Sequence, residues 1–201
     1  MLTAVNYTNQ NTNKLSNEEL DELIIQIAEN KDERAFRRLF DLFYPGMLHL
    51  AYHYVKSYTL AQDAVSEVFI ILWNNRKELT RIKNFRTYIF VLTKNKSIDM
   101  TRNHWIKKRG QFPEDIFMVN TTNSHPEKIF IYQEISRKVK QIIYRMPARC
   151  RLVYVLIKQQ GLKYKETATI LNVSVKAIEK QMGKAMKMLK NGLEEYENDY
   201  L

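Results

Sequence analysis

Basic side chains at helical spacing are the most informative chemical feature of this 201-residue chain. Between residues 175 and 189 the apolar residues step by three and four and would line one buried side of a helix: Val175, Ile178, Met182, Ala185 and Leu189. The lysines of the same stretch would fall on the opposite side: Lys176, Lys180, Lys184 and Lys187. Only Glu179 opposes them, so this stripe predicts contact with a polyanion rather than an ordinary solvated face.

The residues before this stripe have the pattern of a helix-turn-helix. Residues 164–171 predict a short helix, and Asn172 can adopt the left-handed conformation that a tight turn needs. Ser174 is a good N-cap for the following helix, and Ala168 is small where two helices would cross. The second helix of such a motif enters the major groove of DNA.

Other reactive side chains predict no catalysis. His49 and His53 stand four residues apart, a spacing that can hold a metal, but no third ligand lies nearby. Cys150 lies in an apolar stretch typical of a core, although two neighbouring arginines could lower its pKa. Asp63 and Glu67 are also four residues apart, and without a histidine they favour a protein-binding face over a catalytic pair. We therefore expect no enzymatic activity, metal or cofactor.

The positive charge of the chain lies in two blocks. The net charge is +10, and residues 81–109 carry nine bases against the single acid Asp99. A second excess lies in residues 127–201, with fifteen bases against eight acids, and residues 111–126 between the blocks contain no base. This segregation predicts two separate contacts with nucleic acid.

Helical patterns dominate the chain, so the predicted fold is all-α. Ser16 opens a capping box, and a second helix should start near Asp32 and be broken or bent at Pro45. A further capping box at residues 59–62 predicts the start of a third helix, and a basic amphipathic stretch follows from residue 84 to about residue 108.

The predicted architecture is two small helical domains on a flexible linker, the second ending in the helix-turn-helix. The boundaries are a disordered tail at 1–15, a first domain at 16–109, a linker at 110–126 and a second domain at 127–201. Helices should resume at residue 127, and Gly161 should end one that starts near residue 148. The chain shows no apolar run long enough for membrane insertion and no secretory signal, and it has one cysteine, so we expect a cytoplasmic location.

Three stretches together resemble one family. They are DAVSEVFIILW, FRTYIFVLTKNKSIDMTRN and MPARCRLVYVLIKQQGLKYKETATILNVSVKAIEKQMGKAMKMLK, in this order. They look like the extracytoplasmic-function (ECF) group of the sigma-70 family, the minimal two-domain sigma factors of bacterial RNA polymerase. The likeness covers residues 16–193, and the wording from Ser174 to Met182 further resembles variants common in Bacteroidetes.

The resemblance implies a transcription initiation factor that binds RNA polymerase core and places it at promoter DNA. Residues 16–109 would be sigma domain 2 and residues 127–201 sigma domain 4. Four residues would dock on the clamp coiled coil of the polymerase: Asp63, Ser66, Glu67 and Phe69. Seven would melt and read the minus-ten element, with a flipped base near residues 94–96: Arg86, Lys94, Asn95, Lys96, Arg102, Lys107 and Lys108. Six would contact the minus-thirty-five element: Ser174, Lys176, Glu179, Lys180, Lys184 and Lys187.

The resemblance also implies an anti-sigma partner. Lys163 stands where the family usually has a capping serine or threonine, and Ala177 where it often has threonine. An alternative interpretation is a helix-turn-helix regulator whose first domain senses a ligand or dimerises. The nine bases of residues 81–109 argue against that alternative, because a sensing domain does not need them.

Overall fold

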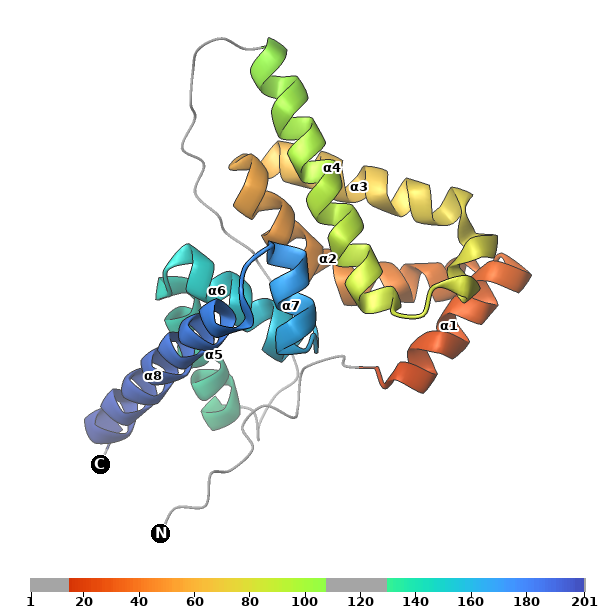
Figure 1. Ribbon diagram of the computed structural model, residues 1–201. Coiled ribbons are helices and arrows are strands. Elements are labelled where there is room, and N and C mark those ends of the chain that lie inside the picture. Colours follow the sequence, from red (N-terminus) through yellow and green to blue (C-terminus); the bar gives the residue numbers. More distant parts are fainter. Residues whose placement is uncertain (1–14, 108–129, 201) are drawn as a thin grey trace.

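Helix α2 (Glu33–Val55) forms the centre of the N-terminal domain in the computed structural model, which describes residues 15–107 and 130–200 (Figure 1). Three helices pack on it: α1 (Asn17–Asn30), α3 (Tyr58–Asn74) and α4 (Phe85–Lys107). The 3-10 helix η1 (Arg76–Arg81) packs on α1 and α3. Leu39, Phe43, Met47 and Leu50 of α2 are fully buried against these neighbours. The core therefore lies around α2. Helices α3 and α4 pack on α2 with one side and expose the other side to solvent.

The starts of the first three helices follow from short capping side chains. Ser16 and Glu19 form the predicted capping box, in which Ser16 Oγ accepts from the Glu19 amide at 3.1 Å. Asp32 caps α2 as expected. The predicted box at residues 59–62 was wrong: α3 already begins at Tyr58, because the extended Ser57 before it accepts from the Leu60 amide at 3.5 Å.

The sequence predicts a break or a bend at Pro45, and α2 is not broken there, because it is continuous from Glu33 to Val55. A proline inside a helix costs about 3 kcal/mol, since it removes one backbone hydrogen bond and crowds the preceding turn. Buried Phe43 and Met47 flank the proline, and the His49 ring bonds the Pro45 carbonyl oxygen at 2.9 Å. Burial of the apolar side chains on both sides offsets the local cost and keeps the helix in one piece.

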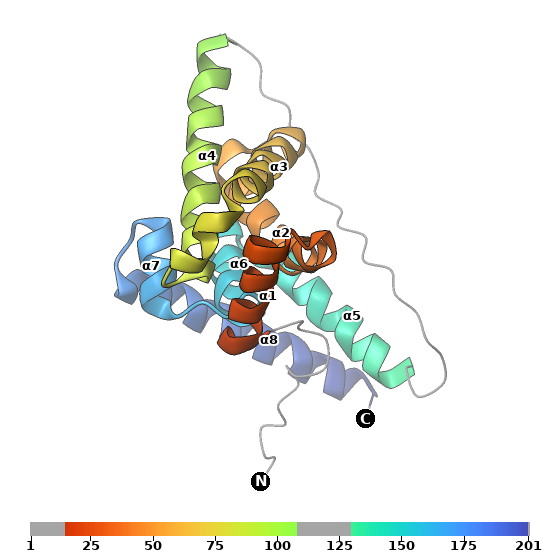
Figure 2. The same ribbon diagram turned by 90° about the vertical axis from the view of Figure 1, so that its right-hand side faces the viewer.

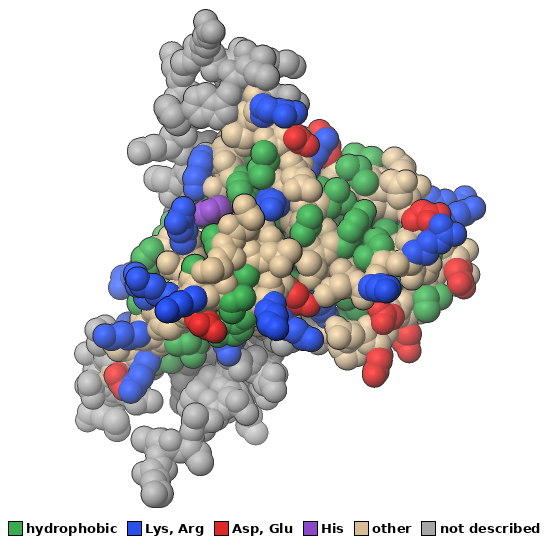
Figure 3. Space-filling view, in the orientation of Figure 1, with side chains coloured by type: hydrophobic (Ala, Val, Ile, Leu, Met, Phe, Trp, Pro, Cys, Tyr) green, Lys and Arg blue, Asp and Glu red, His purple; other side chains and the backbone are tan. Residues whose placement is uncertain are grey.

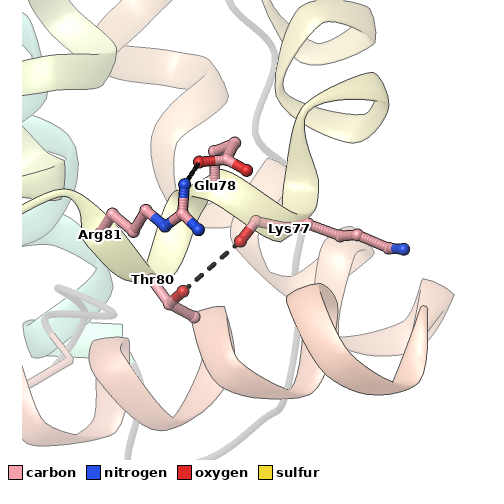
Figure 4. A network of polar contacts seen from close by, with 4 residues as sticks. All are labelled: Lys77, Glu78, Thr80 and Arg81. Carbon is pink, nitrogen blue, oxygen red and sulfur yellow. Dashed lines mark hydrogen bonds and ion pairs between the residues drawn. The ribbon is translucent and has the colours of Figure 1, made fainter.

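Two buried hydroxyl groups of helix α4 are paired with carbonyl oxygens of the same helix. Thr93 and Ser97 are fully buried, and their hydroxyls donate to the carbonyl oxygens of Ile89 and Thr93, both at 2.7 Å. These small side chains let α4 pack against α2 and α3, while Asn95, Asp99 and Arg102 remain exposed. The connection from α3 to α4 runs through η1, where Arg81 and Glu78 form an ion pair at 2.5 Å (Figure 4).

The C-terminal domain consists of α5 (Phe130–Arg145), α6 (Ala148–Tyr154), a π-helical segment η2 (Val155–Gln159), α7 (Tyr164–Leu171) and α8 (Val175–Tyr200). Its core includes Met146, Cys150, Ile178 and Met182. The helix expected from residue 148 to residue 160 therefore changes its winding at Val155, and Gly161 follows with the positive φ of 73° that a glycine accepts easily.

The two domains pack against each other. Figures 1 and 2 both show α7 beside the start of α4. Leu152, Leu156, Leu162 and Ile170 of the C-terminal domain belong to the same buried cluster as the core of the N-terminal domain. The structure thus adds a contact between domains to the architecture that the sequence predicts.

Within residues 15–107 and 130–200, no helix combines the length and the apolar character needed to cross a bilayer.

Candidate nucleic-acid interface

The helix-turn-helix has the predicted local geometry. Asn172 is left-handed, with φ 54° and ψ 51°, and ends α7. Ser174 Oγ accepts from the Ala177 amide at 3.2 Å and so caps the following helix. Lys163 provides no side-chain cap for α7, as expected, but the Glu166 carboxylate accepts from the Lys163 amide at 2.7 Å. The start and end of α7 and the start of α8 are therefore fixed by local hydrogen bonds and backbone conformation.

Helix α8 separates its apolar and basic sides as its spacing predicts. The residues Ile178, Met182, Ala185 and Leu189 are buried, and Val175 is partly buried. The candidate DNA-binding side chains are all exposed: Ser174, Lys176, Glu179, Lys180, Lys184 and Lys187. Figure 3 shows Lys and Arg side chains gathered over the region of α8. This side of the helix can meet a groove of DNA without any rearrangement of the domain.

The candidate minus-ten residues of α4 differ in how accessible they are. Asn95 and Arg102 are exposed, whereas Lys94 and Lys96 are half-buried along the helix. Arg102 pairs loosely with Asp99 at 3.9 Å. The side chain of Lys107 and all of Lys108 lie outside the described residues. An outward row of polar and basic side chains is thus available on the middle of α4.

Arg86, in contrast, does not face solvent as a DNA contact would. Its residue is 8% exposed, and burial lowers the pKa of its guanidinium while nearby Glu166 opposes that shift. Its side chain donates to the carbonyl oxygens of Gln160, at 3.3 Å, and of Leu15. In this packed arrangement Leu15 and Gln160 cover Arg86, so its contact with minus-ten DNA stays a prediction.

Helix α3 presents a mixed polar and apolar outer face. Asp63 and Ser66 are exposed, and Glu67 forms an ion pair with Lys96 of α4. Ile70 is 58% exposed, the largest value among the exposed large hydrophobic side chains of the described residues. Phe69, expected at the polymerase interface, is instead buried.

Aromatic packing explains the position of Phe69. Its ring lies 4.6 Å from the Phe40 ring and 6.0 Å from the Phe36 ring, between centroids. Phe69 therefore holds α3 on α2, and a docking partner would meet the neighbouring polar residues and Ile70.

The remaining candidate residues are structural. Cys150 is buried, its Sγ donates to the Gln181 carbonyl oxygen at 3.3 Å, and burial raises its pKa, with Lys184 opposing. Burial likewise lowers the pKa of His49, which Arg151 lowers further, and that of His53, which also faces Lys56 and Arg149. In the described part of the chain, no three metal-binding side chains gather in one place.

Sequence reasoning missed the residues that connect the domains. Asn84 donates through Nδ2 to Glu166 Oε1 at 2.7 Å, and Gln160 packs closely on Gly46. These partners lie more than 70 positions apart, and each has a sufficient local explanation as a helix cap or a polar residue beside a turn. The spacing of apolar residues along a helix does not indicate which polar residues will meet across two domains.

Two family descriptions match the chain, one for each domain. Residues 39–106 match "Sigma-70 region 2", and residues 132–189 match "Sigma-70, region 4". The first match covers α4 and most of α2, which rules out the alternative of a ligand-sensing N-terminal domain. The second match contains the helix-turn-helix.

Characterised relatives are similar along most of their length. The chain is 23% identical to RNA polymerase sigma-H factor of Pseudomonas aeruginosa, over 88% of this chain and 95% of the relative. It is 23% identical to ECF RNA polymerase sigma factor SigW of Bacillus subtilis, over 84% and 94%, and 22% identical to ECF RNA polymerase sigma-E factor of Escherichia coli, over 88% and 96%. These lineages give no support to the expected likeness to Bacteroidetes variants.

One solved structure has a similar fold. It is the sigma factor RpoE in complex with the anti-sigma factor NepR from Bartonella quintana, with a TM-score of 0.52 and 17% identity. The superposition covers 79% of this chain and 96% of that chain. The all-helical fold with a C-terminal helix-turn-helix is thus shared with a sigma factor of known structure.

Proposed function

Because this chain belongs to the ECF group of sigma-70 family RNA polymerase sigma factors, we propose that α8 reads the minus-thirty-five element and α4 reads the minus-ten element. The chain is a non-enzymatic initiation factor that directs RNA polymerase to promoters through regions 2 and 4. The observation that carries the assignment of α8 is the exposed side described above, which bears four lysines opposite a buried apolar side.

Within α8, three side chains have the chemistry to read bases. Glu179 can accept from the amino group of cytosine, and Lys180 and Lys184 can donate to guanine. Ser174 and Lys176, at the start of the helix, lie where the DNA backbone would pass. Lys187 is three residues beyond Lys184 and can reach only phosphate, which adds affinity but no sequence preference.

Within α4, Asn95 is the proposed reader of a base exposed by melting. Its amide can bond a base edge, and Lys94, Lys96 and Arg102 can hold the sugar-phosphate backbone of the same strand. Lys107 and Lys108, which follow in the sequence, are proposed to contact the same strand. Arg86 joins the row only if the domains separate, since it is covered in the packed arrangement.

The outer face of α3 is the proposed site for the polymerase clamp coiled coil. Asp63, Ser66 and Glu67 supply polar contacts, and exposed Ile70 supplies apolar area that a partner would cover. We further propose a cytoplasmic location, where polymerase and promoter DNA are present. An anti-sigma factor is a proposed partner, in analogy to NepR on the Bartonella quintana protein.

Run-off transcription tests this function. Core polymerase is mixed with the chain and with fragments of genomic DNA, and the starts of the transcripts are mapped. We expect transcripts that need the chain and share two upstream elements. Transcripts that start at the same places with core polymerase alone would contradict the proposal.

A further inference from the structure

A cavity lies between the last turns of α2 and the first turns of α6, which pack on each other. Its volume is about 80 Å³. The side chains that line it include His49, Tyr52, His53 and Lys56 of α2 and Arg151 and Leu152 of α6. The four residues of α2 have the spacing of one side of a helix. Because a water molecule needs about 10–15 Å³ of such space, the cavity has room for a small solute.

The charged side chains that face one another around this cavity are cations. Burial, and then the charges of Lys56 and Arg149, lower the pKa of His53. Burial and Arg149 likewise lower the pKa of Lys56, and burial and Arg151 lower that of His49. Of the ion pairs within residues 15–107 and 130–200, none involves His53, Lys56 or either arginine. The positive charge is therefore left uncompensated by acidic side chains of the described residues.

Arg151 is held in place beside the cavity and has a donor to spare. Its guanidinium lies 5.2 Å from the centroid of the Tyr144 ring, and its Nη2 donates to the Met146 carbonyl oxygen at 3.2 Å. Its Nε is buried without a hydrogen-bond partner among the residues that the structure describes. Buried polar groups without a partner are rare, and cations of like sign that are held together repel one another. An anion in the cavity would relieve both costs.

We propose that this cavity binds a small phosphate-bearing anion, held by His53, Lys56 and Arg151. Ammonium and guanidinium groups form strong charge-assisted hydrogen bonds with phosphate oxygens, and the Tyr52 hydroxyl can donate another. Pockets for larger ligands have volumes of about 300–1,000 Å³, so the small cavity favours a single phosphate group. Lys56 and Arg149 are exposed, so a solute can reach the cavity from solvent. The proposal is independent of the roles of α4 and α8 at promoters.

A bound anion should also change the titration of His53. Lys56 of α2 and Arg149 of α6 face this imidazole, and the Tyr54 ring lies 5.4 Å from it between centroids. The two cations disfavour the protonated imidazole, whereas an anion beside it favours that form. Saturation with phosphate should therefore raise the pKa of His53, a change that a purely structural group of side chains would not produce.

Charge-removing variants of the full chain test the site. Lys56→Gln removes a cation from the wall that α2 provides, and Arg149→Gln removes the cation of α6 that faces it. Lys77→Gln makes the same charge change on η1, where the exposed side chain points away from the ion pair of Glu78 and Arg81 (Figure 4), and it is the matched control. Helicity by circular dichroism shows that every variant is folded.

The affinity for inorganic phosphate is measured by isothermal titration calorimetry, with sodium chloride holding the ionic strength constant. We expect saturable binding of one phosphate to the unmodified chain and to Lys77→Gln. Loss of a charge-assisted hydrogen bond should raise the Kd about tenfold for Lys56→Gln, with a smaller rise for Arg149→Gln. Without phosphate, Lys56→Gln should have a higher Tm than Lys77→Gln, because it relieves repulsion in the cavity.

A second titration identifies the form of the ligand. Adenosine monophosphate that binds as tightly as inorganic phosphate would identify the ligand as a phosphate monoester. Binding of inorganic phosphate alone would identify it as the free ion. Either result supports the site, provided that Lys56→Gln weakens the binding.

Three results would overturn the proposal. The first is phosphate binding that does not saturate, and the second is an equal Kd for Lys56→Gln and Lys77→Gln, since the net charge of the chain would then explain the effect. The third is a His53 pKa that saturating phosphate leaves unchanged. Proton NMR of the imidazoles measures that pKa, and His53→Gln assigns the signal.

Discussion

Lys180 and Lys187 lie about two turns apart on the exposed side of α8, and they should contribute differently to DNA binding. Loss of a base contact costs about 1–3 kcal/mol and relaxes preference at one position. Loss of a phosphate contact weakens all sequences alike and lowers the salt slope by about one unit. We expect the first result for Lys180→Ala and the second for Lys187→Ala, measured on single-base variants of the minus-thirty-five element at two salt concentrations. A uniform loss with Lys180→Ala would mean that α8 docks differently.

Glu67 forms an ion pair with Lys96 and is also proposed to contact the polymerase, and separate measurements can distinguish the two interactions. Its ion pair with Lys96 is partly exposed, with the Glu67 side chain 45% and the Lys96 side chain 29% accessible, so solvent screening should hold its contribution to stability at about 1 kcal/mol or less. Glu67→Lys should therefore leave the fold intact and still weaken binding to polymerase core, because it reverses the charge of the docking face. Glu78→Lys, which breaks the exposed pair with Arg81, is the control. Equal core affinity for both variants would remove α3 from the interface.

At the scale of the helices, two glycines of α8 offer a matched comparison. A Cβ atom at Gly183 would meet nothing within 4 Å, whereas one at Gly192 would lie 2.7 Å from Cδ1 of buried Ile142. Gly183→Ala should therefore stabilise the domain by about 0.5–1 kcal/mol, since alanine loses less backbone entropy in a helix. Gly192→Ala should lose that gain, because α5 must shift to make room. Chemical denaturation followed by helicity measures both, and equal stabilisation would contradict this packing.

Several features of the helices and their ends could be predicted from the sequence. The turn at Asn172 and the cap at Ser174 are local, so residue types alone predict them. The faces of α8 follow from its apolar spacing. The continuity of α2 at Pro45 and the burial of Phe69 depend on tertiary packing, which residue types alone do not reveal. Burial on either side keeps α2 continuous, and an aromatic cluster holds Phe69 inside.

For the whole molecule, stability should fall as the medium becomes mildly acidic. His49 faces Arg151, and His53 faces Lys56 and Arg149, and burial and these cations hold both imidazole pKa values below the ordinary value of about 6.5. The unfolded chain therefore binds protons first, so stability is lost as pH drops through 6.5 towards the lowered pKa values. Denaturation midpoints between pH 8 and 5.5 measure the loss. His49→Gln/His53→Gln should flatten the dependence, and an unchanged slope in that variant would contradict the assignment.

The packing of the two domains is the part of the molecule that sequence could not predict. From the sequence, Asn84 is interpreted as a helix cap and Arg86 as one of nine bases. Glu166 and Gln160 have no feature that sets them apart from other residues of the second domain. The local interpretation of Asn84 as a cap is correct. The contact between the domains forms only because folding brings together residues that are 74 and 82 positions apart in the sequence.

Three leucines of the C-terminal domain, which pack on the N-terminal core, should make the lifetime of the protein in the cell depend on whether polymerase is bound. Leu152, Leu156 and Leu162 are at most 3% exposed, and they belong to one cluster with the N-terminal core. A chain that leaves polymerase with its two domains apart would present part of this apolar surface to water, where chaperones and proteases recognise it. Turnover in the cell should therefore be fastest just after release from a transcribing polymerase and slow once the domains pack together again.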